Sequence, residues 1–259
     1  MRVLFVGDII GKPGRKAFRS CLRALSLKAG FDLVIVNGEN AAGGFGITRK
    51  VADELFSDGA QVITGGNHIW DKKEAVQLLD EEPRIIRPAN YPPGVPGSGS
   101  IIVNTRSGRR IGVLNLAGRV FMNNLDCPFR AADEALKSMR DRADAVIVDF
   151  HAEATSEKIA LGWHLDGRVA AVIGTHTHVQ TADERVLPGG TAYITDAGMT
   201  GPMNSVIGVR TEQIIDRFLL QMPNRYEVAE GPAVFSAVEL HLEASSGLAT
   251  SIKRHYEVV

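Results

Sequence analysis

The chain has 259 residues, of which 44% are hydrophobic and 23% are charged. This is the composition of a packed globular protein, and it excludes long disorder, a collagen-like repeat and a coiled-coil rod. The 29 basic residues nearly balance the 30 acidic ones, so the net charge gives no sign of a polyanionic partner such as duplex DNA. Because α/β proteins of roughly 200–250 residues often form one unit, we expect a single domain over residues 1–259.

The sequence carries no sign of secretion or of membrane insertion. Its first apolar run is broken by Gly7 and Asp8, and no other run approaches the ~18–20 apolar residues that span a bilayer. The two cysteines, Cys21 and Cys127, are too few for a disulfide scaffold and are compatible with a reducing compartment. We therefore expect a cytoplasmic protein that has no membrane partner.

Five short apolar runs, each ending in a polar or glycine-rich turn, indicate the strands of a sheet. They are Val3–Val6, Leu33–Val36, Gln61–Thr64, Ala145–Phe150 and Val169–Ile173. Nearly continuous Val, Ile and Leu is typical of parallel strands that are covered on both faces. Amphipathic segments at Pro13–Lys28 and Arg130–Arg142 predict helices between the strands. The pattern predicts a layered α/β fold with a mostly parallel central sheet and helices on both of its faces.

The remaining segments are expected to add antiparallel strands to this fold. Ser100–Thr105 and Arg110–Leu116 have the pattern of a hairpin inserted into the same sheet system. Ala233–Leu242 and Leu248–Tyr256 form a second predicted hairpin, and an amphipathic helix is predicted before it at Val209–Gln221.

Polar side chains follow each of the five predicted strands. Open α/β sheets bind ligands at the carboxyl ends of their strands, so we expect these side chains to gather at one edge. They are Asp8, Glu39, Asn40, Asn67, His68, His151, His176 and His178. Their oxygen and nitrogen donors suit Mn, Fe or Zn ions, whereas a structural zinc site normally uses thiolates. Two ions that share a carboxylate would hold a phosphoryl group from both sides, which predicts hydrolytic metal chemistry.

Several of these residues also have an ordinary structural interpretation. Asp8 fits a turn or a helix cap, Asn67 and His68 fit the cap of a helix near Asp71–Leu79, and His151 fits a hydrogen-bonded core histidine. Their joint placement favours function, because four of the seven histidines fall at strand ends. The other three are interpreted as surface or structural residues: His164, His241 and His255.

The strand-end blocks resemble a known family. The order Asp8, Glu39-Asn40, Asn67-His68, His151 and His176-Thr177-His178 is similar to the five-block signature of the calcineurin-like metallophosphoesterases. More closely, VGDIIGKPGR, NGENAAGGFGIT, GGNHIWD, DFHAEATSEK, GTHTHVQTAD and TDAGMTGP resemble the bacterial YmdB-type branch, whose members act as 2′,3′-cyclic nucleotide phosphodiesterases. These blocks span residues 6–202. The resemblance implies the metallophosphoesterase fold and a phosphodiesterase that uses two divalent metal ions.

The resemblance also implies a ligand set for the two ions, with Glu39 as the bridge between them. The first ion would be held by Asp8 and His178, and the second would be completed by Asn67, His151 and His176.

His68 matches the superfamily's histidine that contacts the phosphoryl group and protonates the leaving oxygen. The chain departs from the superfamily at two positions. Ile10 stands where a histidine ligand of the first ion is usual, and Asn40 is the nearest candidate to replace it. Ile69 stands where many members have an acidic residue, so we expect His68 to lack its usual orienting partner.

The expected reaction is in-line attack on phosphorus by a hydroxide that the two ions hold, with a nucleotide monophosphate as product. Phe45 offers a stacking surface for the base, although a buried loop anchor also fits its position. Arg130, Lys158 and Arg168 would offer charge to a phosphate, although solvation of helix surfaces explains them equally well.

Other functions are compatible with the same residues. A phosphomonoesterase or a phosphoprotein phosphatase would use the same ligands, because metal ligands do not set the substrate class. A regulatory protein would bind nucleotide or RNA through the metal site, with incidental catalysis, and homo-oligomer formation is left open. A dinucleotide-binding oxidoreductase is disfavoured, because the glycines at 7, 11 and 14 lack the G-x-G-x-x-G spacing.

Overall fold

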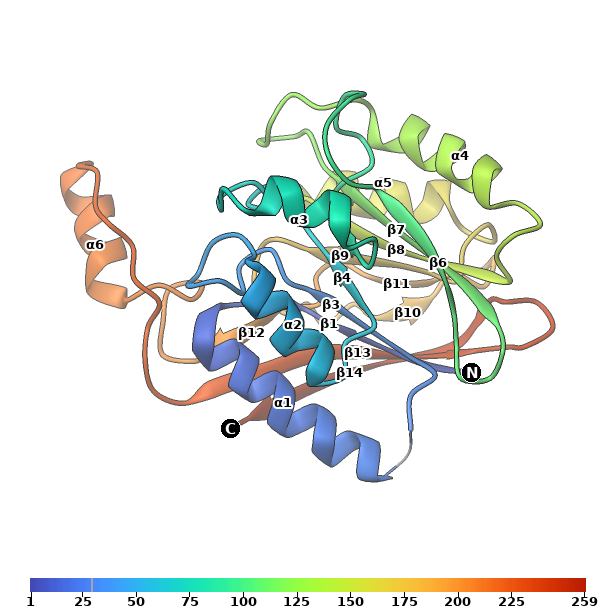
Figure 1. Cartoon of the computed structure of the whole chain (residues 1–259), viewed down its shortest axis with the longest axis horizontal. Coiled ribbons are helices and arrows are strands. Elements are labelled where there is room, and N and C mark those ends of the chain that lie inside the picture. Colours follow the sequence, from blue (N-terminus) through green and yellow to red (C-terminus); the bar gives the residue numbers. More distant parts are fainter. Residues whose placement is uncertain (29) are drawn as a thin grey trace.

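Two facing β-sheets with helices on both outer sides make up the computed structural model, which describes residues 1–28 and 30–259 (Figure 1). The larger sheet has the order β2-β12-β13-β1-β3-β4-β5, with β14 paired to β13. Its strands are β1 (Arg2–Val6), β2 (Asp8–Ile9), β3 (Leu33–Asn37), β4 (Val62–Thr64), β5 (Ile85–Ile86), β12 (Met199–Pro202), β13 (Ala233–Leu242) and β14 (Ala249–Val258). Strands β1, β3, β4 and β5 run parallel to one another.

The smaller sheet has the order β10-β11-β9-β8-β7-β6. Its strands are β6 (Ser100–Asn104), β7 (Arg110–Ala117), β8 (Ala145–His151), β9 (Ala171–Thr175), β10 (Arg185–Val186) and β11 (Ala192–Ile194). Strands β7, β8, β9 and β11 are parallel, and the sheet ends on the antiparallel strands β6 and β10.

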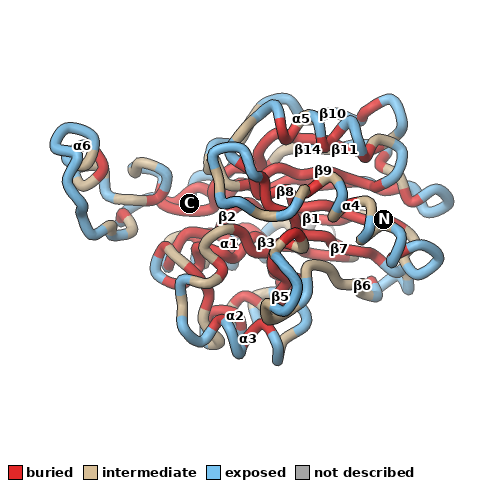
Figure 2. Tube along the Cα trace, turned by 90° about the horizontal axis from the view of Figure 1, so that it is seen from above, coloured by how far each residue is buried: buried red, intermediate tan, exposed pale blue. Residues whose placement is uncertain are grey.

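Six helices are assigned among the described residues: α1 (Gly11–Lys28), α2 (Arg49–Ser57), α3 (Ala75–Glu81), α4 (Pro128–Met139), α5 (Thr155–His164) and α6 (Thr211–Leu220). Apolar residues of α1, α2 and α3 pack on the outer face of the larger sheet. Those of α4 and α5 pack on the outer face of the smaller one. Helix α6 projects from the body, and most of its surface is exposed (Figure 2). Within the described ranges, no helix combines the length and apolar character needed to cross a membrane.

The central parallel strands, such as β1, β3, β4 and β9, are mostly apolar because both of their faces are buried. Side chains alternate along a strand, so Val3 and Phe5 of β1 pack between the two sheets, whereas Leu4 and Val6 pack against the helical layer. The inner layer is completed by residues of the smaller sheet such as Val113. The predicted α/β fold class is therefore confirmed, and both predicted hairpins are present as β6–β7 and β13–β14.

The polar side chains after the five predicted strands were expected to gather at one edge of a single sheet. The structure corrects this expectation. Strands β1, β3 and β4 belong to the larger sheet, whereas β8 and β9 belong to the smaller one. An apolar run shows that both faces of a strand are covered, but a second sheet covers a face as well as a helix does. The carboxyl ends of both sheets still meet, because Asn37 Nδ2 and Thr64 Oγ1 donate to Asp149 Oδ2 across the interface, at 3.1 and 2.5 Å. The predicted site lies at this junction.

Candidate metal centre

The predicted donors are carried to the junction by five short segments. Asp8 begins β2, Glu39 and Asn40 follow β3, Asn67 follows β4, His151 ends β8, and His176 and His178 follow β9. A cavity of about 390 Å³ opens over them and is lined in part by Glu39, Asn40 and both histidines after β9. The site therefore contains side chains that are up to 170 positions apart in the chain, from residue 8 to residue 178.

Asp8, Asn40 and His178 form one group of donors. His178 Nε2 lies 3.2 Å from Asp8 Oδ2 and 3.5 Å from Asn40 Nδ2. Among the described residues, Asp8 Oδ1 and Asn40 Oδ1 are buried without a hydrogen-bond partner. Buried oxygens are rarely left unpaired, because an unmet acceptor costs roughly 1–3 kcal/mol. Two such atoms in one group fit the ligand shell of a cation.

Asn67, His151 and His176 form the second group. His151 Nε2 lies 2.9 Å from Asn67 Oδ1 and 3.1 Å from His176 Nδ1. One donor atom each from Glu39, His151 and His176 lie within 4.8 Å of one another. A single ion would contact all three.

The Glu39 carboxylate lies between the two groups. Its Oε1 is 3.0 Å from Asn40 Nδ2 and 3.2 Å from His151 Nε2. Its Oε2 accepts a hydrogen bond of 3.0 Å from the backbone N–H of His68. One fully buried carboxylate thus contacts both sets of donors, as a ligand shared by two ions must do.

Hydrogen bonds behind the site fix which ring nitrogen faces it. The Thr175 hydroxyl donates its only proton to Asp149 Oδ1 at 2.7 Å, so it accepts from His151 Nδ1 at 2.9 Å. His178 Nδ1 donates to the carbonyl of Ile207 at 3.0 Å. When either ring is neutral, its Nε2 therefore offers a lone pair to the site, as metal-binding histidines do.

The charges of the site compensate one another. Burial opposes ionisation of Glu39, but the charge and hydrogen bond of His151 prevail and hold the pKa of Glu39 at about 2. Burial lowers the pKa of His151, yet Glu39 outweighs it and raises that pKa to about 9. Burial, followed by the charge of His151, lowers the pKa of His176 to about 4. A proton on His151 thus balances the buried carboxylates, and a metal ion would take over that role.

Gly66 leaves the space in which the donors meet. A Cβ at this position would lie 2.2 Å from Glu39 Oε2 and 2.4 Å from His151 Nε2. Any side chain would therefore displace the carboxylate and the imidazole. The absent Cβ, the unpaired oxygens and the O/N donor set together fit a pair of divalent ions.

Comparison with known proteins places the chain in a family. The family model described as YmdB-like protein matches residues 4–255. The chain belongs to the YmdB-like family. It is 49% identical to a Bacillus subtilis protein named 2′,3′-cyclic-nucleotide 2′-phosphodiesterase, over 98% of this chain and 96% of that protein.

Two solved structures are similar to this YmdB-like chain. A hypothetical protein from Thermus thermophilus aligns with a TM-score of 0.94 and 45% identity, covering 100% of this chain and 99% of the other. A structure described as a novel phosphatase of Mycoplasma pneumoniae aligns with a TM-score of 0.93 and 35% identity, covering 100% and 93%. These matches confirm the fold class and the family that the strand-end blocks indicated.

His68 stands at the edge of the cavity with a partner that the sequence interpretation missed. Its Nδ1 lies 2.8 Å from Asp71 Oδ2. The usual partner at position 69 is absent, as expected from Ile69, but the turn after β4 brings Asp71, the third residue beyond His68, to the ring in its place. The predicted substrate residue Phe45 also lines the cavity, with its ring centroid 5.0 Å from that of His68 in an edge-on arrangement.

Two acidic residues near the predicted metal donors were not assigned roles from the sequence of this YmdB-like protein. Glu153 Oε2 lies 3.1 Å from His176 Nε2, and Asp149 orients His151 through Thr175. Both belong to the block DFHAE, which was singled out for His151. The sequence therefore located these two residues near the site but did not indicate what they contact.

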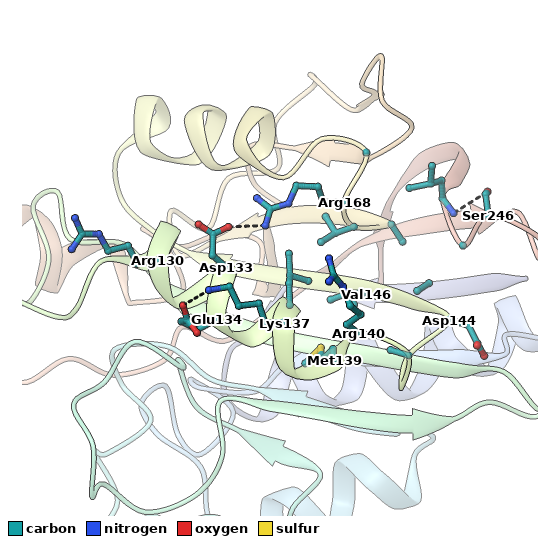
Figure 3. Close-up of a pocket in the computed structure, with 18 residues that line it drawn as sticks. Arg130, Asp133, Glu134, Lys137, Met139, Arg140, Asp144, Val146, Arg168 and Ser246 are labelled. Carbon is teal, nitrogen blue, oxygen red and sulfur yellow. Dashed lines mark hydrogen bonds and ion pairs between the residues drawn. The ribbon is translucent and has the colours of Figure 1, made fainter.

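The cationic residues proposed for phosphate binding lie elsewhere. Lys158 is buried and pairs with Asp196 at 2.8 Å. Arg130 and Arg168 line a separate cavity of about 720 Å³ beside α4, near the starts of β8 and β9, where Arg168 pairs with Asp133 (Figure 3). Of the two interpretations left open for these residues, phosphate contact at the predicted site is not supported, because none of the three lines the cavity over the donors. The amphipathic pattern of a helix does not show which end of the sheet it faces.

The three remaining histidines have structural contacts, as expected. They pair with acidic residues away from the site: His164 with Asp133, and His241 and His255 with Glu239.

Proposed function

We propose that this chain is a dinuclear metal-dependent phosphodiesterase that hydrolyses 2′,3′-cyclic nucleotides. The observation that carries the proposal is the position of Glu39, whose one carboxylate contacts both donor groups. The name of the B. subtilis relative supports the substrate class. Because the relatives include a protein described as a phosphatase, a phosphomonoesterase is the second candidate.

The residues fit the roles that the resemblance implies. Asp8, Asn40 and His178 would hold the first ion, Asn67, His151 and His176 the second, and Glu39 both. When bound, the ions supply Lewis-acid activation of water and neutralise charge on the phosphoryl group. Asn40 takes the place of the missing histidine ligand in this proposal, because its free buried Oδ1 belongs to the first group.

His68 supplies the proton for the leaving ribose oxygen. Its Nδ1–H donates to Asp71, so the proton given to the leaving oxygen is the Nε2 proton of the imidazolium, and the neutral ring that results keeps its proton on Nδ1. The edge of the cavity suits this role, since the His68 side chain is 33% exposed and is accessible to a ligand.

The cavity has the mixed lining that a nucleotide requires. Proposed metal donors line it together with apolar side chains that include Phe45, Ile214 and Val228, and the acidic Glu153 and Glu227 also border it. The apolar part accommodates a base and ribose while the phosphodiester lies against the donors.

The rates on three substrates test this proposal. Initial rates are compared on a 2′,3′-cyclic nucleotide, bis-p-nitrophenyl phosphate and p-nitrophenyl phosphate, with Glu39→Gln as the inactive reference. A phosphodiesterase prefers the first two substrates, and a preference for the monoester favours the phosphatase. Retention of the cellular phenotype in a Glu39→Gln strain without turnover would favour a regulatory nucleotide- or RNA-binding protein.

Several further expectations stay predictions. They are the single domain over residues 1–259, the choice among Mn, Fe and Zn, the cytoplasmic location, and association with RNA or with a second copy of the chain.

A further inference from the structure

A buried ion pair lies behind the histidines that follow β9. Lys158 of α5 and Asp196, between β11 and β12, are 1% and 0% exposed, and Nζ lies 2.8 Å from Oδ2. Removing two charges from water costs about as much as their attraction returns, so a buried pair is weak evidence for stability alone. The contacts of this pair point to another role.

The Asp196 carboxylate accepts several hydrogen bonds from the chain around it. Its Oδ2 accepts from the backbone N–H of Thr177 at 3.1 Å and from its hydroxyl at 2.7 Å. Its Oδ1 accepts from the N–H of Gly198 at 2.8 Å, and the carbonyl of Gly198 accepts from the N–H of Asp8 at 3.1 Å. One carboxylate thus links the turn that carries two metal donors to the strand that carries a third.

The backbone of that turn is strained. His176 and His178, on either side of Thr177, have φ values of 98° and 66°. Side chains other than glycine rarely adopt this region, and such a conformation persists only when its surroundings enforce it. Both side chains nevertheless face the site, with His176 Nδ1 3.1 Å from His151 and His178 Nε2 3.2 Å from Asp8.

We propose that Asp196 and Lys158 are positioning residues of the metal centre, an assignment that rests on the proposed function. Asp196 fixes Thr177, and thereby the strained turn that presents His176 to one ion and His178 to the other. Lys158 balances the charge of the Asp196 carboxylate, whose four acceptor contacts need both of its oxygens. Lys158 ends the block DFHAEATSEK, which also contains His151, and Asp196 lies in the block TDAGMTGP, which contains none of the proposed ligands.

Three variants separate an effect on metal binding from an effect on the stability of the fold. Asp196→Asn replaces one acceptor oxygen by an amide donor, and Lys158→Met leaves a buried carboxylate without its counter-charge, so both lower Tm. The double variant removes both charges, and we expect its Tm to recover toward that of the parent. The double replacement of the exposed pair Asp133 and Arg168, by Asn and Met, is the matched control.

The readout is the affinity of the protein for Mn²⁺, measured by calorimetry on chelator-treated samples at pH 7.5. We expect a loss of at least tenfold in the double Lys158 and Asp196 variant despite its recovered Tm, and no change in the control. Parent-like Mn²⁺ affinity in a folded double variant would overturn the proposal, as would an equal loss in the control. If the parent binds two Mn²⁺ ions but hydrolyses no cyclic nucleotide, the proposed activity fails, whereas the positioning role needs only the metal centre and is decided by the Mn²⁺ affinities of the variants.

Discussion

The His68 imidazole and the Asp71 carboxylate form a pair, with 2.8 Å between Nδ1 and Oδ2. The next residue in the chain, Ile69, is buried in the core and is unable to serve the ring. Asp71 therefore supplies the orienting contact that an acidic residue at position 69 would supply. The pair fixes the imidazole at the edge of the cavity, where the leaving oxygen of a substrate would lie.

Replacing Asp71 by Asn should lower kcat by about tenfold with little effect on metal content, because the ring loses the negative charge that stabilises its protonated form and fixes its tautomer. Steady-state kinetics and metal analysis of the same preparation check this. The variant His68→Ala should lower kcat further than Asp71→Asn does. The double variant should be no slower than His68→Ala alone, since the two residues act as a unit. Additive losses would show that Asp71 acts independently of His68.

Gly66→Ala should prevent metal binding. The new Cβ would meet Glu39 Oε2 at 2.2 Å and His151 Nε2 at 2.4 Å, so neither side chain keeps its position. Calorimetric titration with Mn²⁺ measures the effect. Gly30→Ala is the control, because no atom lies within 4 Å of a Cβ built there. Full Mn²⁺ affinity in Gly66→Ala would contradict the geometry of the site.

The metal-free protein should become less stable as the pH rises from 7 toward 9.5. The pKa of His151 is raised from 6.5 to about 9 in the fold. Its contribution to stability is therefore fully present below pH 6.5 and is lost as the pH rises through about 9. Thermal unfolding of chelator-treated protein measures the trend, which Glu39→Gln should flatten. Saturating metal should also flatten it, because the ion replaces the proton. A constant Tm for the metal-free parent across this range would contradict the assignment.

Phe45→Ala should raise KM for a 2′,3′-cyclic nucleotide by about tenfold, since stacking on a base is worth ~1–3 kcal/mol. KM for bis-p-nitrophenyl phosphate, which has no nucleobase, should rise less. Phe45→Leu keeps apolar bulk beside His68 and serves as the comparison for packing. Equal changes in KM on both substrates would assign Phe45 to packing alone.

Much of the site was predictable because strand ends are visible in the sequence. Apolar runs stop abruptly before Asp8, Glu39 and Asn67, and parallel strands bring such positions together. The division of the strands between two sheets was not predictable, since a helix and a sheet cover an apolar face equally well. Contacts across a turn or between layers, such as Asp71 with His68, depend on backbone paths that periodicity does not encode.

Lys158 is a second residue whose contacts could not be predicted from the periodicity of the sequence. Its helical neighbours suggest a solvated surface, yet the turn of α5 that carries it packs toward β9 and Asp196. A lone buried lysine is costly, so its burial becomes intelligible only with the partner 38 residues away.

The most direct measurement is the number of metal ions per chain, determined for protein purified without chelator and again after reconstitution, alongside phosphodiesterase activity. The account predicts that the reconstituted parent binds two ions and that activity rises with the second ion. It also predicts that Glu39→Gln no longer binds two ions. A maximum of one ion per chain, with activity unchanged by added metal, would contradict it.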